Sequence, residues 1–279
     1  FLIDKKKRYS IINIRGSDIL NYIGIDIGST ATKVAVRGDN NIEFQVPTGW
    51  NSKDTSNLVK EKLLKDYKID INDGNALIIS TGYGRISVEY ADKEITEITC
   101  HARGALEFTN EDTCTVIDVG GQDTKVINIS GGFVEDFRMN DKCSAGTGKF
   151  LEVMANRLGV TLEEMFQMSN IGEVLEISSM CTVFAESEII SHIGNGQPRE
   201  NIAAGVVDSV VSRVAQLANR QGLNGQIILT GGLSIDPIFV KKLSQKLDMP
   251  IHTDEKGRFA GAIGGAMIAK EKFERKGRL

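Results

Sequence analysis

Two stretches of the sequence combine a carboxylate, a glycine turn and hydroxyl or amide side chains. The first is Asp26-Ile27-Gly28-Ser29-Thr30, and the second is Asp118-Val119-Gly120-Gly121-Gln122-Asp123. Glycine lets backbone N–H groups approach phosphate oxygens, and the hydroxyls of Ser29 and Thr30 add donors. A carboxylate does not favour phosphate, but it suits Mg²⁺, directly or through water, and Mg²⁺ accompanies ATP. The two stretches therefore indicate a phosphate and metal site.

The two stretches form an internal repeat, about 92 residues apart, and each is followed by a Thr-Lys pair, Thr32-Lys33 and Thr124-Lys125. One Asp-x-Gly turn marks any hairpin, whereas two matched copies favour a phosphate site. Lys33 could neutralise phosphate charge. Two similar α/β halves facing each other would place the turns on opposite walls of one cleft.

Two further glycine-rich stretches follow in the C-terminal part. Thr230-Gly231-Gly232-Leu233 comes after a short apolar run, where small residues permit close packing against adenine or ribose. Gly261-Ala262-Ile263-Gly264-Gly265-Ala266 would let a helix pack tightly, as at an interdomain hinge, although an ordinary close-packed helix explains it equally well.

The elements that must position these residues alternate between strands and helices, which indicates an α/β protein. Predicted strands cover residues 22–27, 32–37, 42–46, 76–80, 113–119, 124–129, 133–139, 227–229 and 251. Predicted helices cover about 58–67, 95–108, 148–158, 161–169, 184–193 and 199–221. Another lies between residues 232 and 251, and a last one begins at about 261.

Composition supports a globular protein of 279 residues, 41% apolar and 25% charged. The net charge of −4 argues against nonspecific nucleic-acid binding. No apolar run approaches the roughly 20 residues of a membrane span, and no secretory signal is visible, so we expect a cytoplasmic protein without a membrane partner. Residues 1–21, with the run Lys5-Lys6-Lys7-Arg8, do not resemble the rest and are interpreted as an extension, disordered or artificial.

The chain has four cysteines, Cys100, Cys114, Cys143 and Cys181. In a cytosolic chain of this size, they argue against a disulfide framework. The plainest interpretation is four free thiols in the core. Cys100 and Cys114 lie in apolar contexts and fit that interpretation.

Three stretches together resemble a known family: residues 25–33, residues 118–125 and residues 139–148, the last reading Met-Asn-Asp-Lys-Cys-Ser-Ala-Gly-Thr-Gly. The first resembles the actin/Hsp70/sugar-kinase superfamily. The other two resemble, more narrowly, the activator ATPases of (R)-2-hydroxyacyl-CoA (2-hydroxyglutaryl-CoA) dehydratases, of the BadF/BadG/BcrA/BcrD type. The resemblance covers about residues 22–272.

The resemblance implies two ribonuclease H-like (actin-like ATPase) α/β domains around a nucleotide cleft. Domain I would comprise residues 22–109 plus 258–279, and domain II residues 110–257. Asp26 and Asp118 would handle Mg²⁺, and Gln122 or Asp123 would position the attacking water. The residues implied to bind ATP or ADP are Gly28, Ser29, Thr30, Thr32, Lys33, Gly120, Gly121, Gly146, Thr147, Gly148, Lys149, Gly231, Gly232 and Leu233.

The resemblance also implies a homodimer with one [4Fe-4S] cluster between the protomers, held by Cys143 and Cys181 of each chain. A reduced ferredoxin or flavodoxin would load the cluster, and ATP would drive one electron to a 2-hydroxyacyl-CoA dehydratase component in an anaerobic cell. A [4Fe-4S] cluster needs four thiolates, and each of these cysteines precedes a predicted helix, whose N-terminus favours negative charge. Glu186 could link cluster and nucleotide, or serve no such role.

Two other functions compete with this one. A small-molecule (sugar) kinase of the same superfamily would need a general-base aspartate facing a sugar pocket, and it leaves the stretch around Cys143 unexplained. A chaperone or filament-forming ATPase would carry a substrate-binding domain or subdomain insertions, which this sequence lacks.

Overall fold

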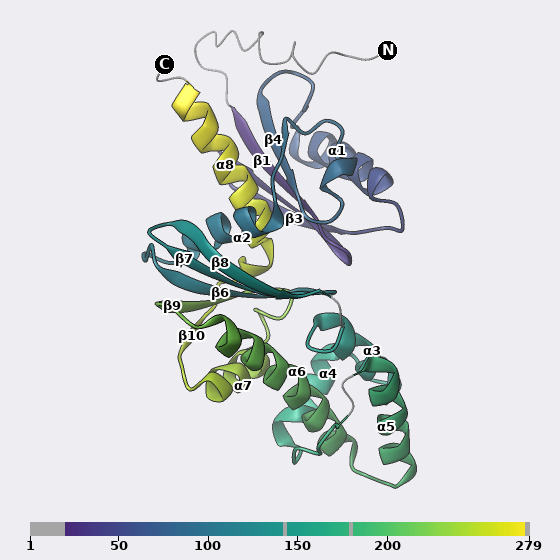
Figure 1. Ribbon diagram of the computed structural model, residues 1–279. Coiled ribbons are helices and arrows are strands. Elements are labelled where there is room, and N and C mark those ends of the chain that lie inside the picture. The colour runs from purple at the N-terminus through teal and green to yellow at the C-terminus, as the bar shows by residue number, and fades with distance from the viewer. Residues whose placement is uncertain (1–19, 142–143, 179–180, 277–279) are drawn as a thin grey trace. The chain divides into compact units, whose positions relative to one another are not determined.

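The computed structural model describes residues 20–141, 144–178 and 181–276. The chain folds into two compact units, and each has a five-stranded sheet with parallel and antiparallel pairs (Figure 1). Unit 1 comprises the described residues up to Gly104 and from Phe259 onward, and unit 2 comprises those from Ala105 to Arg258. Among the described helices, none has the length and apolar content of a bilayer span.

Unit 1 has the strand order β3-β2-β1-β4-β5. Its strands β1 to β3 are antiparallel neighbours, whereas β4 runs parallel to β1 and β5 runs parallel to β4. Its elements are β1 (Asn21–Ile27), β2 (Ala31–Arg37), β3 (Ile42–Pro47), α1 (Ser52–Tyr67), β4 (Ala76–Thr81), β5 (Lys93–Glu94), α2 (Glu97–Ala105) and α8 (Ala260–Lys276).

The two faces of strand β1 pack against different parts of unit 1, because successive side chains of a strand point to opposite faces of the sheet. Ile23, Ile25 and Ile27 are buried in one cluster with apolar residues of α1. Gly24 and Asp26 point to the other face, where α8 packs (Figure 1).

The approach of α8 to the sheet requires glycine. A Cβ on Gly24 would lie 1.8 Å from the carbonyl oxygen of Ala262, and one on Gly264 would lie 1.7 Å from that of Cys100. The tight packing predicted for the Gly261–Ala266 stretch is therefore confirmed, and it brings α8 against both β1 and α2.

Unit 2 has the strand order β10-β9-β6-β7-β8. Its elements are β6 (Cys114–Val119), β7 (Thr124–Ser130), β8 (Phe133–Asn140), α3 (Gly148–Leu158), α4 (Leu162–Ile171), α5 (Thr182–Gly194), α6 (Arg199–Gln221), β9 (Gln226–Gly231), α7 (Pro237–Leu247) and β10 (Ile251–His252). The long helix α6 lies at the centre of a large apolar core that also includes residues of α3, α4 and α7. This core positions the loops at the ends of β6 and β9.

The internal repeat is confirmed as two matching hairpins. In β1–β2, Asp26 is the register partner of Lys33, and in β6–β7, Asp118 is the partner of Lys125. A parallel strand flanks each hairpin, with Thr81 of β4 beside Asp26 and Thr230 of β9 beside Asp118. A glycine follows each of these threonines, so the repeat includes a Thr-Gly pair that sequence spacing alone had not matched.

Helix boundaries agree with the predictions where the apolar spacing is regular and differ elsewhere. The helices predicted at 148–158 and 199–221 have these bounds as α3 and α6. Helix α1 begins at Ser52, before the predicted 58, because the side chain of Asn51 caps it by accepting from the N–H of Lys53. The helix predicted over 95–108 is shorter, since α2 ends at Ala105 and a 3₁₀ turn follows.

Candidate functional site

The turn between β1 and β2 presents donors to solvent. Ser29 and Thr30 are exposed. The Nζ atom of Lys33 lies 3.4 Å from the position that a Cβ on Gly28 would take, so the lysine provides positive charge beside the turn. Thr32, by contrast, is buried, and its Oγ1 lies 2.8 Å from that of Thr48. The side chains of Ser29, Thr30 and Lys33 could contact a phosphate. Thr32 instead connects β2 to the chain after β3.

Asp26, at the end of β1, is 3% exposed, and within the described part of the chain its Oδ1 has no hydrogen-bond partner. Two glycines make room for it. A Cβ on Gly82 would lie 2.5 Å from Oδ1, and one on Gly261 would lie 2.8 Å from Oδ2. A buried carboxylate oxygen without a partner is costly. A hydrated Mg²⁺ would satisfy this oxygen, so the site fits the ion.

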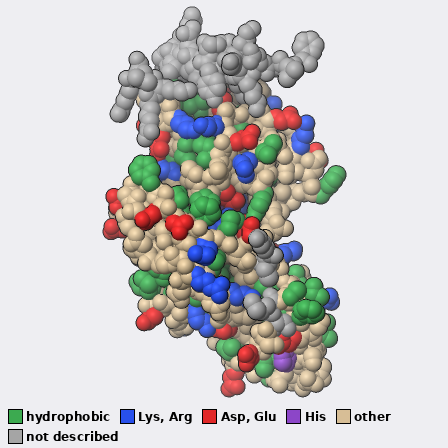
Figure 2. Space-filling view, in the orientation of Figure 1, with side chains coloured by type: hydrophobic (Ala, Val, Ile, Leu, Met, Phe, Trp, Pro, Cys, Tyr) green, Lys and Arg blue, Asp and Glu red, His purple; other side chains and the backbone are tan. Residues whose placement is uncertain are grey.

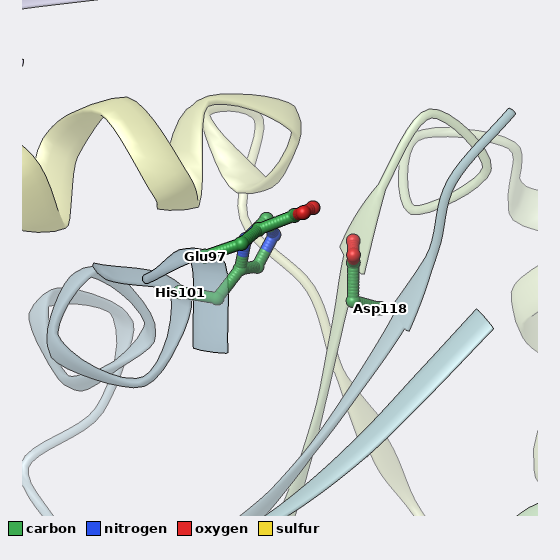
Figure 3. A group of neighbouring side chains, drawn as sticks. All are labelled: Glu97, His101 and Asp118. Atoms are coloured by element: carbon green, nitrogen blue, oxygen red, sulfur yellow. The ribbon is translucent and has the colours of Figure 1, made fainter. Parts of the chain in front are cut away.

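Helix α2 brings a histidine to the same place in unit 1. Figure 3 shows that Glu97 and His101 project from successive turns of this helix. His101 is 4% exposed, and its Nδ1 lies 3.1 Å from the Cβ position of Gly261 that is also next to Asp26. The sequence-based predictions missed His101, and the Glu-x-x-x-His spacing was the available signal.

In unit 2 the carboxylate of Asp118, which Figure 3 also draws, has partners. Its Oδ2 lies 3.3 Å from the Nζ of Lys125, and its Oδ1 accepts a hydrogen bond of 3.3 Å from the Oγ1 of Thr230. Lys125 also pairs with Asp123 at 2.6 Å. Lys125 is 1% exposed and both carboxylates are 3% exposed. The lysine therefore holds two strand-end carboxylates in a buried ion cluster, a role that the sequence alone did not indicate.

The structure gives different environments to Gln122 and Asp123, the two residues that the sequence left as alternatives for positioning water. Asp123 is buried against Lys125, and its carbonyl oxygen accepts from the N–H of Gly120 at 2.9 Å. The side chain of Gln122 is exposed at the tip of the turn. Gln122 is thus the more accessible of the two side chains.

The start of α3 holds this turn in place. The backbone N–H groups of Gly148 and Lys149 donate to the carbonyl oxygens of Gly120 and Gly121, both at 2.9 Å. The buried hydroxyl of Thr147 donates to the carbonyl oxygen of Ser144 at 2.6 Å. The resemblance implied that Thr147, Gly148 and Lys149 bind ATP; in the structure, Gly148 and Lys149 support the turn between β6 and β7.

The turn after β9 lies against the end of β6. Gly231 has φ +87°, and a Cβ there would lie 2.6 Å from Oδ1 of Asp118. A Cβ on Gly232 would meet no atom within 4 Å, so this residue borders open space. Leu233 is buried in the apolar core. The turn therefore leaves the backbone at Gly232 accessible.

The cysteines fall into two classes. Cys100 and Cys114 are buried free thiols, and burial raises the pKa of Cys100 to about 12 and that of Cys114 to about 11, so both are inert, as expected. Cys181 is exposed and directly precedes α5. Cys143 lies outside the described residues.

The two chain segments that contain the predicted cluster cysteines meet. Ser144, which follows Cys143 in the sequence, and Thr182, which follows Cys181, are joined by a hydroxyl hydrogen bond of 2.6 Å. Glu186, on the first turns of α5, forms an ion pair with Arg157 of α3. The structure thus gives Glu186 a contact between two helices.

Known proteins resemble the chain along most of its length. The (R)-2-hydroxyglutaryl-CoA dehydratase activating ATPase of Acidaminococcus fermentans is 40% identical over 255 residues, 90% of this chain and 97% of the relative. The crystal structure of component A of that organism's dehydratase has a TM-score of 0.83 at 39% identity, covering 91% of this chain and 98% of the other. An activator of 2-hydroxyisocaproyl-CoA dehydratase from Clostridium difficile, with bound ADPNP, has a TM-score of 0.84 at 36% identity, with 93% and 98% covered.

A more distant likeness shows the fold alone. A glucokinase of the ROK family from Streptomyces griseus has a TM-score of 0.58 at 15% identity, covering 90% of this chain and 99% of the other. Both this likeness and the two sheets with their flanking helices confirm the predicted actin-like α/β fold. A family profile matches residues 23–269. Together with the relatives above, this match shows that the chain belongs to the BadF/BadG/BcrA/BcrD ATPase family.

Proposed function

We propose that this protein is an ATP-hydrolysing activator that passes one electron to a 2-hydroxyacyl-CoA dehydratase component. The observation that carries the proposal is the 40% identity, over 90% of the chain, to a relative described as a dehydratase activating ATPase. A second structural relative with bound ADPNP supports the nucleotide. The two hairpins supply the residue types that such a ligand needs.

In this proposal the phosphates of ATP contact the turn at Gly28, Ser29 and Thr30, with Lys33 adding positive charge. The exposed hydroxyls and the nearby Nζ support this assignment. Asp26 would hold Mg²⁺ or one of its waters, since its Oδ1 is buried without a hydrogen-bond partner among the described residues. Gly232 would contact the adenosine part of ATP, because it borders open space.

The second hairpin would serve hydrolysis. Asp118 is assigned to the metal's water shell and is oriented by Lys125 and Thr230. Of the two candidates for positioning the attacking water, we favour Gln122. Its side chain is exposed, whereas Asp123 is engaged by Lys125. Asp123 would then keep Lys125 and Asp118 in position.

The redox part of the proposal assigns Cys143 and Cys181 of two chains to one [4Fe-4S] cluster. The fit is supported by the exposed thiol of Cys181 and by the hydrogen bond between Ser144 and Thr182. Beside Cys181, the side chains of Val183 and Phe184 on α5 are 65% and 68% exposed, which suits a homodimer contact. When bound, such a cluster supplies one-electron chemistry. A ferredoxin or flavodoxin would be the electron donor.

The proposed function is tested by determining where the γ-phosphate of ATP is transferred. Anaerobically purified, iron-reconstituted protein is incubated with Mg²⁺ and ATP labelled in the γ-phosphate, with and without glucose. We expect the label in inorganic phosphate, at a rate that glucose does not change, because no acceptor other than water is needed. Label in a glucose phosphate would contradict the proposal and favour the sugar kinase that shares the fold.

A further inference from the structure

A groove of about 380 Å³ lies in unit 2, between the edge strand β8 and helix α6. Three of its lining residues are arginines: Arg138 on β8, and Arg213 and Arg220 on α6. No acidic residue is among the described residues that line it. Figure 2 shows Lys and Arg side chains gathered on the face of unit 2 that it displays. Like charges gathered around one hollow favour the binding of an anion there.

The charges of two of these arginines are available to a ligand. Within the described part of the chain, Arg138 and Arg220 form no ion pair, and both are exposed. Asp136 lies two residues before Arg138 on β8, but its carboxylate is engaged by Gln221 at 3.0 Å and by the N–H of Phe137 at 2.8 Å. These bonds, with a smaller contribution from Arg138, lower the pKa of Asp136. The nearest carboxylate along β8 is therefore already committed to other donors.

The remaining lining of the groove indicates what kind of anion it would take. Met139, Val214 and Leu217 provide apolar surface, and Thr124 and Asn140 provide polar atoms. The volume lies in the range of small-molecule pockets, about 300–1,000 Å³. A concave site of this size, with cations around apolar side chains, is better suited to binding a small organic phosphate than to binding the flat surface of another protein.

The groove is distinct in position from the turn at Gly231 and Gly232. That turn follows β9, whereas the groove adjoins β8, and β6 and β7 lie between these strands in the sheet. Neighbouring strands are about 4.8 Å apart, so β8 and β9 are separated by three spacings, roughly 14 Å.

The groove nevertheless adjoins the loop at Ala145 and Gly146, which leads into the start of α3 that supports the turn between β6 and β7. Gly146 has φ +90°, and a Cβ there would lie 3.1 Å from the Cβ of Arg213. The carbonyl oxygen of Gly146 accepts from Thr124 Oγ1 at 2.7 Å, and that of Ala145 accepts from Asn140 Nδ2 at 3.0 Å. An occupant of the groove would therefore contact the residues that fix this loop.

We propose that the groove lined by Arg138, Arg213 and Arg220 is a second anion site, which binds the phosphate group of a small organic phosphate. The guanidinium groups of Arg138 and Arg220 form charge-assisted hydrogen bonds to the phosphate, and the apolar side chains contact the organic part. This site goes beyond the proposed ATPase function and does not depend on it.

The test uses phenyl phosphate as the probe, titrated by calorimetry into the full-length protein with saturating ADPNP and Mg²⁺. We expect one bound molecule per chain, and affinity reduced on the order of tenfold or more in the double variant Arg138→Gln/Arg220→Gln. Lys65→Gln, which removes an exposed charge from α1, is the matched control and should leave the affinity unchanged.

Two results would overturn the second site. One is the absence of phenyl phosphate binding, or equal binding by the double variant and the parent protein. The other is a parallel loss of ADPNP affinity in the double variant, measured separately, because the groove would then belong to the nucleotide site. Failure of ADPNP to bind at all would count against the proposed ATPase instead, and the dependence of phenyl phosphate binding on the two arginines would still decide the groove.

Discussion

Replacing Lys125 with methionine is expected to lower the free energy of unfolding by roughly 3–5 kcal/mol, the usual cost of removing one partner from a buried ion pair. Lys125 is the cation for both Asp118 and Asp123, at 3.3 and 2.6 Å. Without it, two carboxylates that are each 3% exposed lose the cation that they share. The measurement is the midpoint of urea unfolding followed by circular dichroism.

The matched control for this prediction is Lys33→Met, at the equivalent position of the first hairpin. Lys33 is half-buried and forms no ion pair within the described ranges, so its loss should cost less than about 1 kcal/mol. The triple variant Asp118→Asn/Asp123→Asn/Lys125→Met should recover much of the lost stability, since it removes the stranded charges. Equal midpoints for Lys125→Met and Lys33→Met would contradict the stabilising role of Lys125 in the buried ion cluster.

Replacing Asp26 with asparagine should reduce ATP turnover about 100-fold or more, without lowering the unfolding midpoint. A metal ion contributes several kcal/mol to the transition state of phosphoryl transfer, and about 3 kcal/mol corresponds to a factor of roughly 100. Stability is expected to hold because Oδ1 of Asp26 has no hydrogen-bond partner among the described residues. Replacing the charge with a neutral amide removes a desolvation cost. Turnover is measured as phosphate release at saturating Mg²⁺.

Asp118→Asn provides the contrast, since it should also reduce turnover but should lower the midpoint. Its carboxylate is engaged by Lys125 and by Thr230, so the substitution leaves Lys125 with one carboxylate fewer. Wild-type turnover in Asp26→Asn would exclude Asp26 from the metal site. A fall in the midpoint of Asp26→Asn as large as that of Asp118→Asn would show that both carboxylates are structural.

The repeat of the two hairpins could be predicted from sequence, because Asp-x-Gly and Thr-Lys fix both the turn and the register. The expected difference in stability between the two hairpins, which depends on the ion pairs of Lys125, could not be predicted. Asp123 in the second hairpin corresponds to Ala31 in the first, so only one of the two lysines gains a second carboxylate. Lysine is ordinarily exposed, and only the burial of the strand ends shows that Lys125 is an exception.

The glycine-rich C-terminal helix was predicted to pack closely, and it does, because only glycine admits a neighbouring backbone at such distances. The supports of the second turn were not predicted as such. The bonds from Gly148 and Lys149 to the carbonyl oxygens of Gly120 and Gly121 join segments far apart in the sequence, and local spacing carries no signal for such contacts. The Glu-x-x-x-His spacing could have marked His101 as a candidate, but its proximity to Asp26 could not be predicted, because it depends on how α8 and α2 pack.

The proposed function requires that one protein couples a nucleotide to a redox centre held by Cys143 and Cys181. The most direct measurement is the electron paramagnetic resonance spectrum of the dithionite-reduced protein, prepared anaerobically, with ADP and with ADPNP. We predict an iron–sulfur signal whose shape differs between the two nucleotides and which Cys181→Ser abolishes, whereas Cys114→Ala, at a buried thiol, retains it. A protein without the signal after iron reconstitution, or with the same spectrum in both nucleotides, would contradict the claim.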